Sequence, residues 1–89
     1  MTANIDAVVM KIVDTYGLAP DSSFNIPWPV FVRLMASGYP PVYTCTKTIR
    51  DKWQILHALG YLVQVNQYAS SVNVQRIFTE VVPRVRGEQ

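Results

Sequence analysis

Apolar residues at helical spacing dominate the first part of the chain. From Ile5 to Tyr16 they recur three and four positions apart, as the buried stripe of one helix requires. Thr2 or Asn4 can cap the start of this helix, and Gly17 is placed to end it. Several β-branched residues lower the intrinsic helix propensity of this stretch. The periodicity outweighs that effect, so the pattern predicts a first helix.

A polar connection and a second, shorter helix follow. Segment 18–27 is rich in Pro, Asp, Ser and Asn, and within it Phe24 and Ile26 alternate with polar neighbours. This alternation predicts a short strand before the helix. Residues 28–38 then carry an apolar stripe, with Pro29 in the first turn, where its missing N–H costs nothing. The stripe consists of Val30, Phe31, Leu34 and Met35.

The third predicted helix begins after an extended segment. Residues 39–44 contain two consecutive prolines, which exclude helical geometry. Thr44, Thr46 and Thr48 are all suited to cap the helix that follows, and Thr48 can form a capping box with Asp51. The positions expected to point inward are Ile49, Trp53, Leu56 and Leu59.

After Gly60, which is placed to end this helix, the apolar period changes from helical to strand-like. Residues 61–68 and 72–80 alternate, and the polar "QYASS" between them has the length of a hairpin turn. The last residues, 81–89, contain a proline, become polar and are expected to form a tail or short arm. The sequence therefore predicts one α+β domain over residues 1–80, with three helices, a C-terminal β-hairpin and a short strand before the second helix.

The stretch "TCTKTIRDKWQILHALGYLVQV", residues 44–65, resembles the recognition helix and first wing strand of the winged helix-turn-helix DNA-binding family. A polar, Thr-rich start leads to an apolar residue, to others four and then three positions further on, and to a glycine followed by large apolar residues. These positions are Ile49, Trp53, Leu56, Gly60 and Tyr61–Leu62. The resemblance covers about residues 3–79 and implies a winged-helix fold. Two features depart from the family pattern: the connection before the third helix is long and proline-rich, and the hairpin turn has no Lys or Arg.

The resemblance implies sequence-specific binding of double-stranded DNA by a small transcriptional regulator. The helix at about 45–59 would enter the major groove, and the hairpin at about 61–79 would act as the wing. Helical geometry turns Lys47, Arg50 and Gln54 outward, where the two cations can donate to guanine and Gln54 can pair with adenine. Further DNA contacts are expected from Thr44, Thr46, Thr48, Arg33, Lys52 and Arg76, and from Gln67, Tyr68, Ser70 and Ser71 in the turn.

Charge and composition agree with a binding protein. The net charge is only +2, but residues 33–76 carry a balance of +4, so an anionic partner is expected there. A basic surface that is merely solvated is the alternative interpretation. No apolar run approaches the roughly 18 residues of a membrane span, and the N-terminus lacks the features of a secretory signal. We therefore expect an intracellular, cytoplasmic protein without membrane contact.

Catalysis is not expected. One cysteine, Cys45, and one histidine, His57, allow neither an internal disulfide nor an all-Cys/His zinc site. The chain shows no Gly-rich phosphate loop, no paired carboxylates on one helix face and no His–carboxylate–nucleophile set. We accordingly expect no metal, no cofactor and no small-molecule effector.

A homodimer on a two-fold DNA site is expected, because a single small wing module contacts few base pairs. The first helix and residues 80–89 are the candidate dimer surfaces. Two alternatives stay open. A winged helix can serve protein–protein interaction without touching DNA, which the low net charge and the uncharged turn favour. A replication factor, or a factor for plasmid or viral maintenance, would bind DNA in the same way for another purpose.

Overall fold

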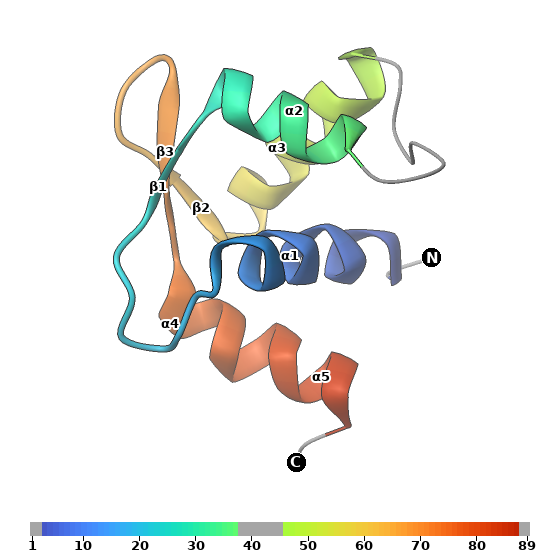
Figure 1. Cartoon of the computed structure of the whole chain (residues 1–89), viewed down its shortest axis with the longest axis vertical. Helices are drawn as coiled ribbons and strands as arrows, with labels where there is room; N and C mark the ends of the chain where they lie inside the picture. The colour runs from blue at the N-terminus through green and yellow to red at the C-terminus, as the bar shows by residue number, and fades with distance from the viewer. Residues whose placement is uncertain (1–2, 38–45, 88–89) are drawn as a thin grey trace.

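The chain adopts an α+β fold in which a small antiparallel sheet lies at one side of the helices (Figure 1). The computed structural model describes residues 3–37 and 46–87, so the extended geometry expected for residues 39–44 lies outside the described part. The elements in chain order are α1 (Ala3–Tyr16), β1 (Asn25–Pro27), α2 (Trp28–Ala36), α3 (Thr46–Ala58), β2 (Leu62–Gln64), β3 (Ala69–Val72), α4 (Val74–Arg76), η1 (Ile77–Val81) and α5 (Val82–Arg86). No helix among the described residues is long and apolar enough to cross a membrane.

The first and third helices end where the sequence predicts. Gly17 and Gly60 follow them with φ angles of +60° and +84°, a left-handed conformation that costs other residues free energy. The start of α3 differs from the expectation. It begins at Thr46, so Thr48 and Asp51 lie inside the helix. The expected capping box at Thr48 is therefore wrong, because a capping residue must itself be non-helical.

The sheet joins the predicted hairpin to the predicted short strand. Both β1 and β2 pair antiparallel with β3, which gives the strand order β1-β3-β2. Ile26 in β1 lies opposite Ser70 in β3, and Val63 in β2 lies opposite Ser71. The hairpin is shorter than expected, and its second strand begins at Ala69. Ser70 and Ser71 therefore belong to the strand and not to the turn.

The strand predicted for residues 72–80 is wrong beyond Val72. The side chain of Asn73 accepts a hydrogen bond from the N–H of Arg76 at 3.3 Å and caps a helical segment that runs through α4, η1 and α5. The residues that alternate as in a strand also include a helical stripe, Val74, Ile77 and Val81, which is buried. This is a fourth helical segment where the sequence predicts three helices, and Val82 is buried within it, so the folded domain continues past residue 80.

A π-helical turn allows this segment to contain Pro83. The proline has no N–H to donate to the carbonyl four residues earlier, and its ring would clash with that carbonyl in a regular α-helix. The structure widens the preceding turn, so that the N–H of Val82 donates to the carbonyl of Ile77, five residues back. The helix continues through the proline and ends at Gly87, whose φ is +74°.

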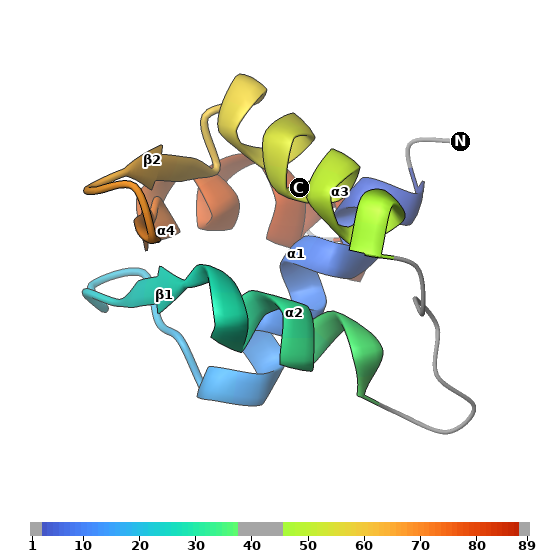
Figure 2. The same ribbon diagram turned by 90° about the horizontal axis from the view of Figure 1, so that it is seen from above.

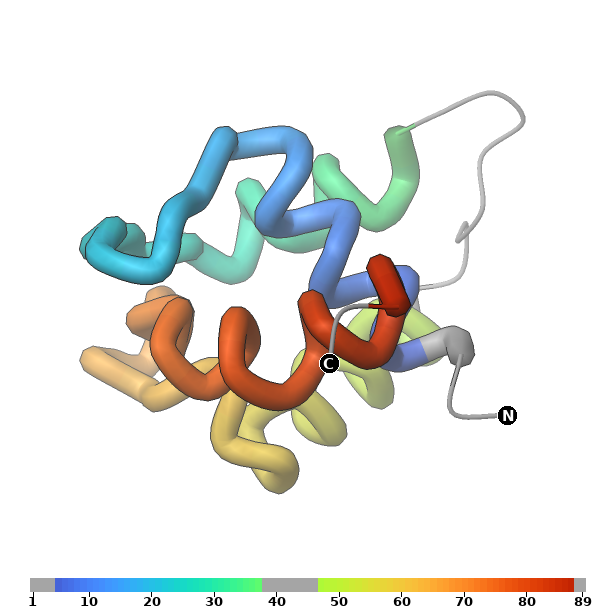
Figure 3. The backbone as a smooth tube through the Cα atoms, turned by 90° about the horizontal axis from the view of Figure 1, so that it is seen from below, coloured from blue at the N-terminus to red at the C-terminus, as the bar shows by residue number. Residues whose placement is uncertain are grey.

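α1 is the central helix of the molecule. It lies between α2 and α3 on one side and the C-terminal helical segment on the other (Figure 1; seen from above and from below in Figures 2 and 3). Most of its apolar stripe packs into the core, since Val8, Val9, Ile12 and Val13 are buried. These four side chains are not accessible to a second copy, so any dimer contact of the first helix would have to use its other residues.

Candidate nucleic-acid interface

α3 has one face in the core and one face open to the surroundings. Ile49 and Leu56 are buried and Trp53 is half-buried, as predicted. The exposed residues of its first turns are Lys47, Thr48, Arg50, Asp51 and Gln54. The inward position expected for Leu59 is wrong: it is 42% exposed, because α3 ends at Ala58 and the chain turns away at Gly60.

An aromatic cluster connects the start of α2 to the middle of α3. The ring centroids of Trp28 and Trp53 are 5.5 Å apart in an edge-on arrangement, and those of Phe31 and Trp53 are 4.9 Å apart. The guanidinium carbon of Arg50 lies 5.9 Å from the Trp28 ring centroid, within the range of a cation–π contact. The cluster therefore holds the Arg50 cation against the exposed side of the α2–α3 pair.

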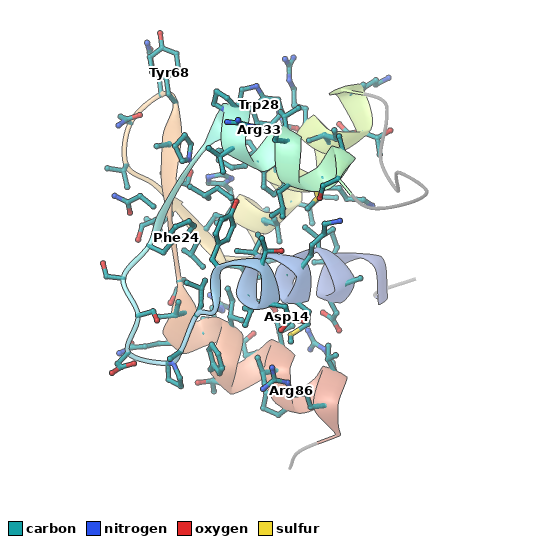
Figure 4. All side chains as sticks on the ribbon, in the orientation of Figure 1. Asp14, Phe24, Trp28, Arg33, Tyr68 and Arg86 are labelled. Atoms are coloured by element: carbon teal, nitrogen blue, oxygen red, sulfur yellow. The ribbon has the colours of Figure 1, made fainter. Side chains whose placement is uncertain are left out.

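The hairpin turn lies at the same end of the molecule. The backbone N–H of Trp28 donates to the carbonyl of Tyr68 at 2.6 Å. Asn66 Oδ1 accepts from the N–H groups of Tyr68 and Ala69 at 2.8 and 3.0 Å, which fixes the turn. The Tyr68 side chain is 66% exposed and projects away from the body of the protein at the end that also holds Trp28 and Arg33 (Figure 4).

Several of the residues predicted to contact DNA come together there. Arg50, Gln54, Gln67 and Tyr68 line one hollow of about 320 Å³ together with Trp28 and Trp53. Lys47, Thr48 and Arg33 are exposed, and Lys52 is half-buried. Thr46 supplies the first residue of α3, and Thr44 lies outside the described residues.

The serines expected at the turn are placed differently. Ser70 is fully buried, and its Oγ lies 2.5 Å from Nε2 of His57, whose Nδ1–H donates to the carbonyl of Trp53 at 2.7 Å. Because nothing outside the protein reaches this hydroxyl, Ser70 is removed from the candidate DNA contacts. Ser71 is half-buried within β3 and lines a different hollow, beside Asp21 and Val74.

Arg76 is also apart from the group. It lies beyond the C-terminal end of α3, where its guanidinium donates to Glu80 at 2.8 Å and sits 6.0 Å from the ring of Tyr61. A cation already paired with a carboxylate gains less from a phosphate than an unpaired one does. The structure therefore assigns Arg76 to contacts within the domain, with Glu80 and Tyr61.

Six of the described cations form two contrasting groups. Arg76, Arg84 and Arg86 form ion pairs, with Glu80, Asp6 and Asp14 respectively. Arg84 donates two hydrogen bonds to Asp6, at 2.8 and 2.9 Å, and this carboxylate, with Tyr61 as a second partner, raises the pKa of the guanidinium above its usual value. Arg33, Lys47 and Arg50 form no ion pair with any described residue, and all three are exposed.

The sequence interpretation did not include Trp28 among the site residues. Its position could have indicated a site residue. Trp28 is a large aromatic residue directly before Pro29, at the start of a helix, where few residues of the same helix can cover its side chain. No group of three His, Cys, Asp or Glu residues in the described part of the chain is placed to hold a metal ion.

Comparison with known proteins finds no match for this chain. No protein-family model matches it, and neither a curated protein nor a solved structure matches it significantly.

Proposed function

We propose that this protein is a winged-helix protein that binds double-stranded DNA sequence-specifically and acts as a small transcriptional regulator. The observation that carries the proposal is that the exposed cations of α2 and of the first turns of α3, namely Arg33, Lys47 and Arg50, form no ion pair with a described residue. Unneutralised cations on one surface are the electrostatic requirement for contact with phosphates.

The order of elements supports a winged-helix topology. A helix, a short strand, two helices that pack on each other and a hairpin follow in this order, and the short strand completes the sheet next to the hairpin. Gly60 turns the chain directly from the end of α3 into β2, so the hairpin stays beside the helix. The fourth helical segment packs against α1, on the side away from α3, and leaves the proposed surface open (Figure 1).

In this proposal α3 enters the major groove, which admits one α-helix. Lys47 and Arg50 donate to the O6 and N7 of guanine, and Gln54 pairs with N6 and N7 of adenine, since these side chains lie on the outer face of the first turns. Arg33 contacts phosphates from α2, and Gln67 and Tyr68 do so from the wing.

The test is a titration of labelled duplex fragments of mixed sequence, followed by fluorescence anisotropy at several salt concentrations. Log affinity should fall linearly with log salt, with a slope of about −0.9 for each phosphate contacted. Lys47→Gln should make this slope less steep by about 0.9 if it contacts a phosphate, whereas Arg86→Gln, which removes one charge near α1, should not. Absence of binding even at low salt would contradict the proposal.

Binding as a homodimer is part of the proposal, because specific affinity from so small a module requires two half-sites. With most of the stripe of α1 buried in the core, the contact would use other surfaces of the domain. Sedimentation velocity with a palindromic fragment should give the mass of two chains per duplex. One chain per duplex at all protein concentrations would remove the dimer from the proposal.

Use as a protein-interaction module is the second candidate. Ile55 and Leu59 are 39% and 42% exposed. Ile55 lies in the last turn of α3, and Leu59, which directly follows this helix, donates its N–H to the Ile55 carbonyl. Exposed apolar side chains at this spacing suit the packing of a partner protein. The salt titration separates the two candidate functions. A DNA-binding protein binds the duplex less tightly as salt rises, whereas a protein-interaction module does not bind the duplex.

A further inference from the structure

The hollow between α2, α3 and the hairpin turn has the features of a small binding site. Its volume, about 320 Å³, lies at the lower end of the range of about 300–1,000 Å³ common for ligand pockets. Residues from three separate parts of the chain line it: Trp28 begins α2, Arg50, Trp53 and Gln54 lie on α3, and Gln67 and Tyr68 lie in the turn.

The walls of this hollow are held in place by contacts within the protein. The two tryptophan rings pack edge to face, and the Trp28 N–H bonds the Tyr68 carbonyl. Asn66 fixes the backbone of the turn, and His57 joins α3 to β3 through its hydrogen bonds to Trp53 and Ser70. A site whose walls are already ordered loses little conformational entropy when a ligand binds.

The chemistry of the lining selects the class of ligand. Three aromatic rings offer flat apolar surfaces, and Gln54 and Gln67 each carry a carboxamide with both a donor and an acceptor. Arg50 supplies a positive charge, and the lining contains no carboxylate. A planar heterocycle with donors and acceptors on its edge and a negative charge attached to it fits this set, and a nucleotide is such a ligand.

A base within a duplex cannot use this site, because its faces are covered by the neighbouring base pairs. An unpaired base has free faces and a free pairing edge, and it can stack on an aromatic ring. We propose that the hollow binds an unpaired nucleotide that adjoins the duplex held by α3, so that the protein recognises a junction between double-stranded and single-stranded DNA. This inference rests on the proposed function.

The experiment compares two DNA ligands that differ only in a short single-stranded thymidine overhang. Both tryptophans of the chain line the hollow, so their fluorescence reports its occupation directly. The overhang ligand should bind about 5- to 150-fold more tightly than the blunt duplex, because stacking of one base contributes about 1–3 kcal/mol. It should also quench the tryptophan fluorescence.

Tyr68→Ala should remove this difference between the two ligands, because any contact of Tyr68 with the duplex itself is common to both and cancels in the ratio of their affinities. The matched control is Val65→Ala, because Val65 is 56% exposed near the same turn but does not line the hollow. Circular dichroism checks that both variants are folded. Equal affinity for the two ligands, or an advantage that Tyr68→Ala retains, would overturn the inference.

The outcomes separate this inference from the proposed function. Salt-dependent binding of the blunt duplex with no gain from the overhang would remove the nucleotide site and leave the proposed function standing. A thymidine single strand without a duplex serves as a third ligand. If this strand quenched the tryptophan fluorescence in a Tyr68-dependent way while the blunt duplex did not bind, duplex recognition by α3 and with it the junction would be contradicted, and the hollow would be a site for single strands alone.

Discussion

The two ends of the molecule use the same type of side chain in different ways. At the end formed by α1 and the C-terminal helical segment, Arg84 and Arg86 pair with the carboxylates of Asp6 and Asp14. Arg86 and Asp14 are labelled in Figure 4. At the end formed by α2, the first turns of α3 and the hairpin turn, the exposed arginines and Lys47 meet no carboxylate among the described residues. The first arrangement attaches one helix to another, whereas the second leaves charge for an external anion.

The comparison shows why the net charge alone says little about a partner. A value of +2 is small, but the acids that offset the basic residues are not spread evenly in space. Asp6 and Asp14 lie on α1 and form ion pairs with Arg84 and Arg86, which follow much later in the chain. The local density of unpaired cations is therefore higher than the total suggests, and it is this local density that an anionic ligand meets.

The largest expected effect concerns the two faces of α3. One face stabilises the fold and the other is open to an external partner, so the contrast between the two ends of the molecule recurs within one helix. Leu56→Ala should lower the free energy of unfolding by about 2–5 kcal/mol, because it leaves a cavity in a fully buried position. Gln54→Ala should change it by less than about 0.5 kcal/mol, because the side chain is exposed. Urea denaturation measures both, and similar losses would contradict the assignment of an inner and an outer face.

A smaller loss of stability is expected from Arg84→Ala. The substitution leaves the Asp6 carboxylate, whose side chain is 12% exposed, without the guanidinium that binds it through two hydrogen bonds. Arg86→Ala is the matched control, because its ion pair is 3.7 Å long and both side chains are about half exposed or more. The urea midpoint should fall for Arg84→Ala and stay unchanged for Arg86→Ala. If both midpoints stayed unchanged, the described contrast between structural and free arginines would be lost.

Most of the framework could be predicted from local patterns. The helical stripe of α1, the glycines after α1 and α3, and Pro29 in the first turn of α2 act through the backbone close to their own positions. The change in the spacing of apolar residues after Gly60, from helical to strand-like, similarly predicted β2. Such features depend on residues within one or two turns, which a sequence shows directly.

The C-terminal part could not be predicted in the same way. Residues 74–82 satisfy both a strand-like and a helical pattern, and tertiary contact with α1 decides in favour of the helix. The pairing of Asp6 with Arg84 joins residues 78 positions apart, for which no local pattern exists. The burial of Ser70 likewise follows from its distant partner His57. Sequence patterns thus placed the outer face of α3 correctly but added a serine that belongs to the interior.

Ser70→Ala tests whether Ser70 belongs to the interior of the protein. The substitution should lower the free energy of unfolding by about 1 kcal/mol, because it removes a hydrogen bond with His57 and leaves the Nε2 atom without this partner. Ser71→Ala, in the next position of β3, removes a half-buried hydroxyl and should cost less. Thermal denaturation of the two variants gives the comparison. If Ser71→Ala were the more destabilising change, the structural role of the His57–Ser70 contact would be contradicted.

The smallest expected change in stability is that of Arg33→Gln. Arg33 is exposed on α2 and has no ion pair with a described residue, so the free energy of unfolding should change by less than about 0.5 kcal/mol. If Arg33 contacts a phosphate as proposed, the same substitution should weaken duplex binding at low salt and make the slope of log affinity against log salt less steep by about 0.9. Arg86→Gln removes the same charge at the opposite end and should leave that slope unchanged. A loss of stability without a change in slope would show that Arg33 serves the fold, as Arg84 does, and would leave Lys47 and Arg50 as the cations proposed to contact phosphates.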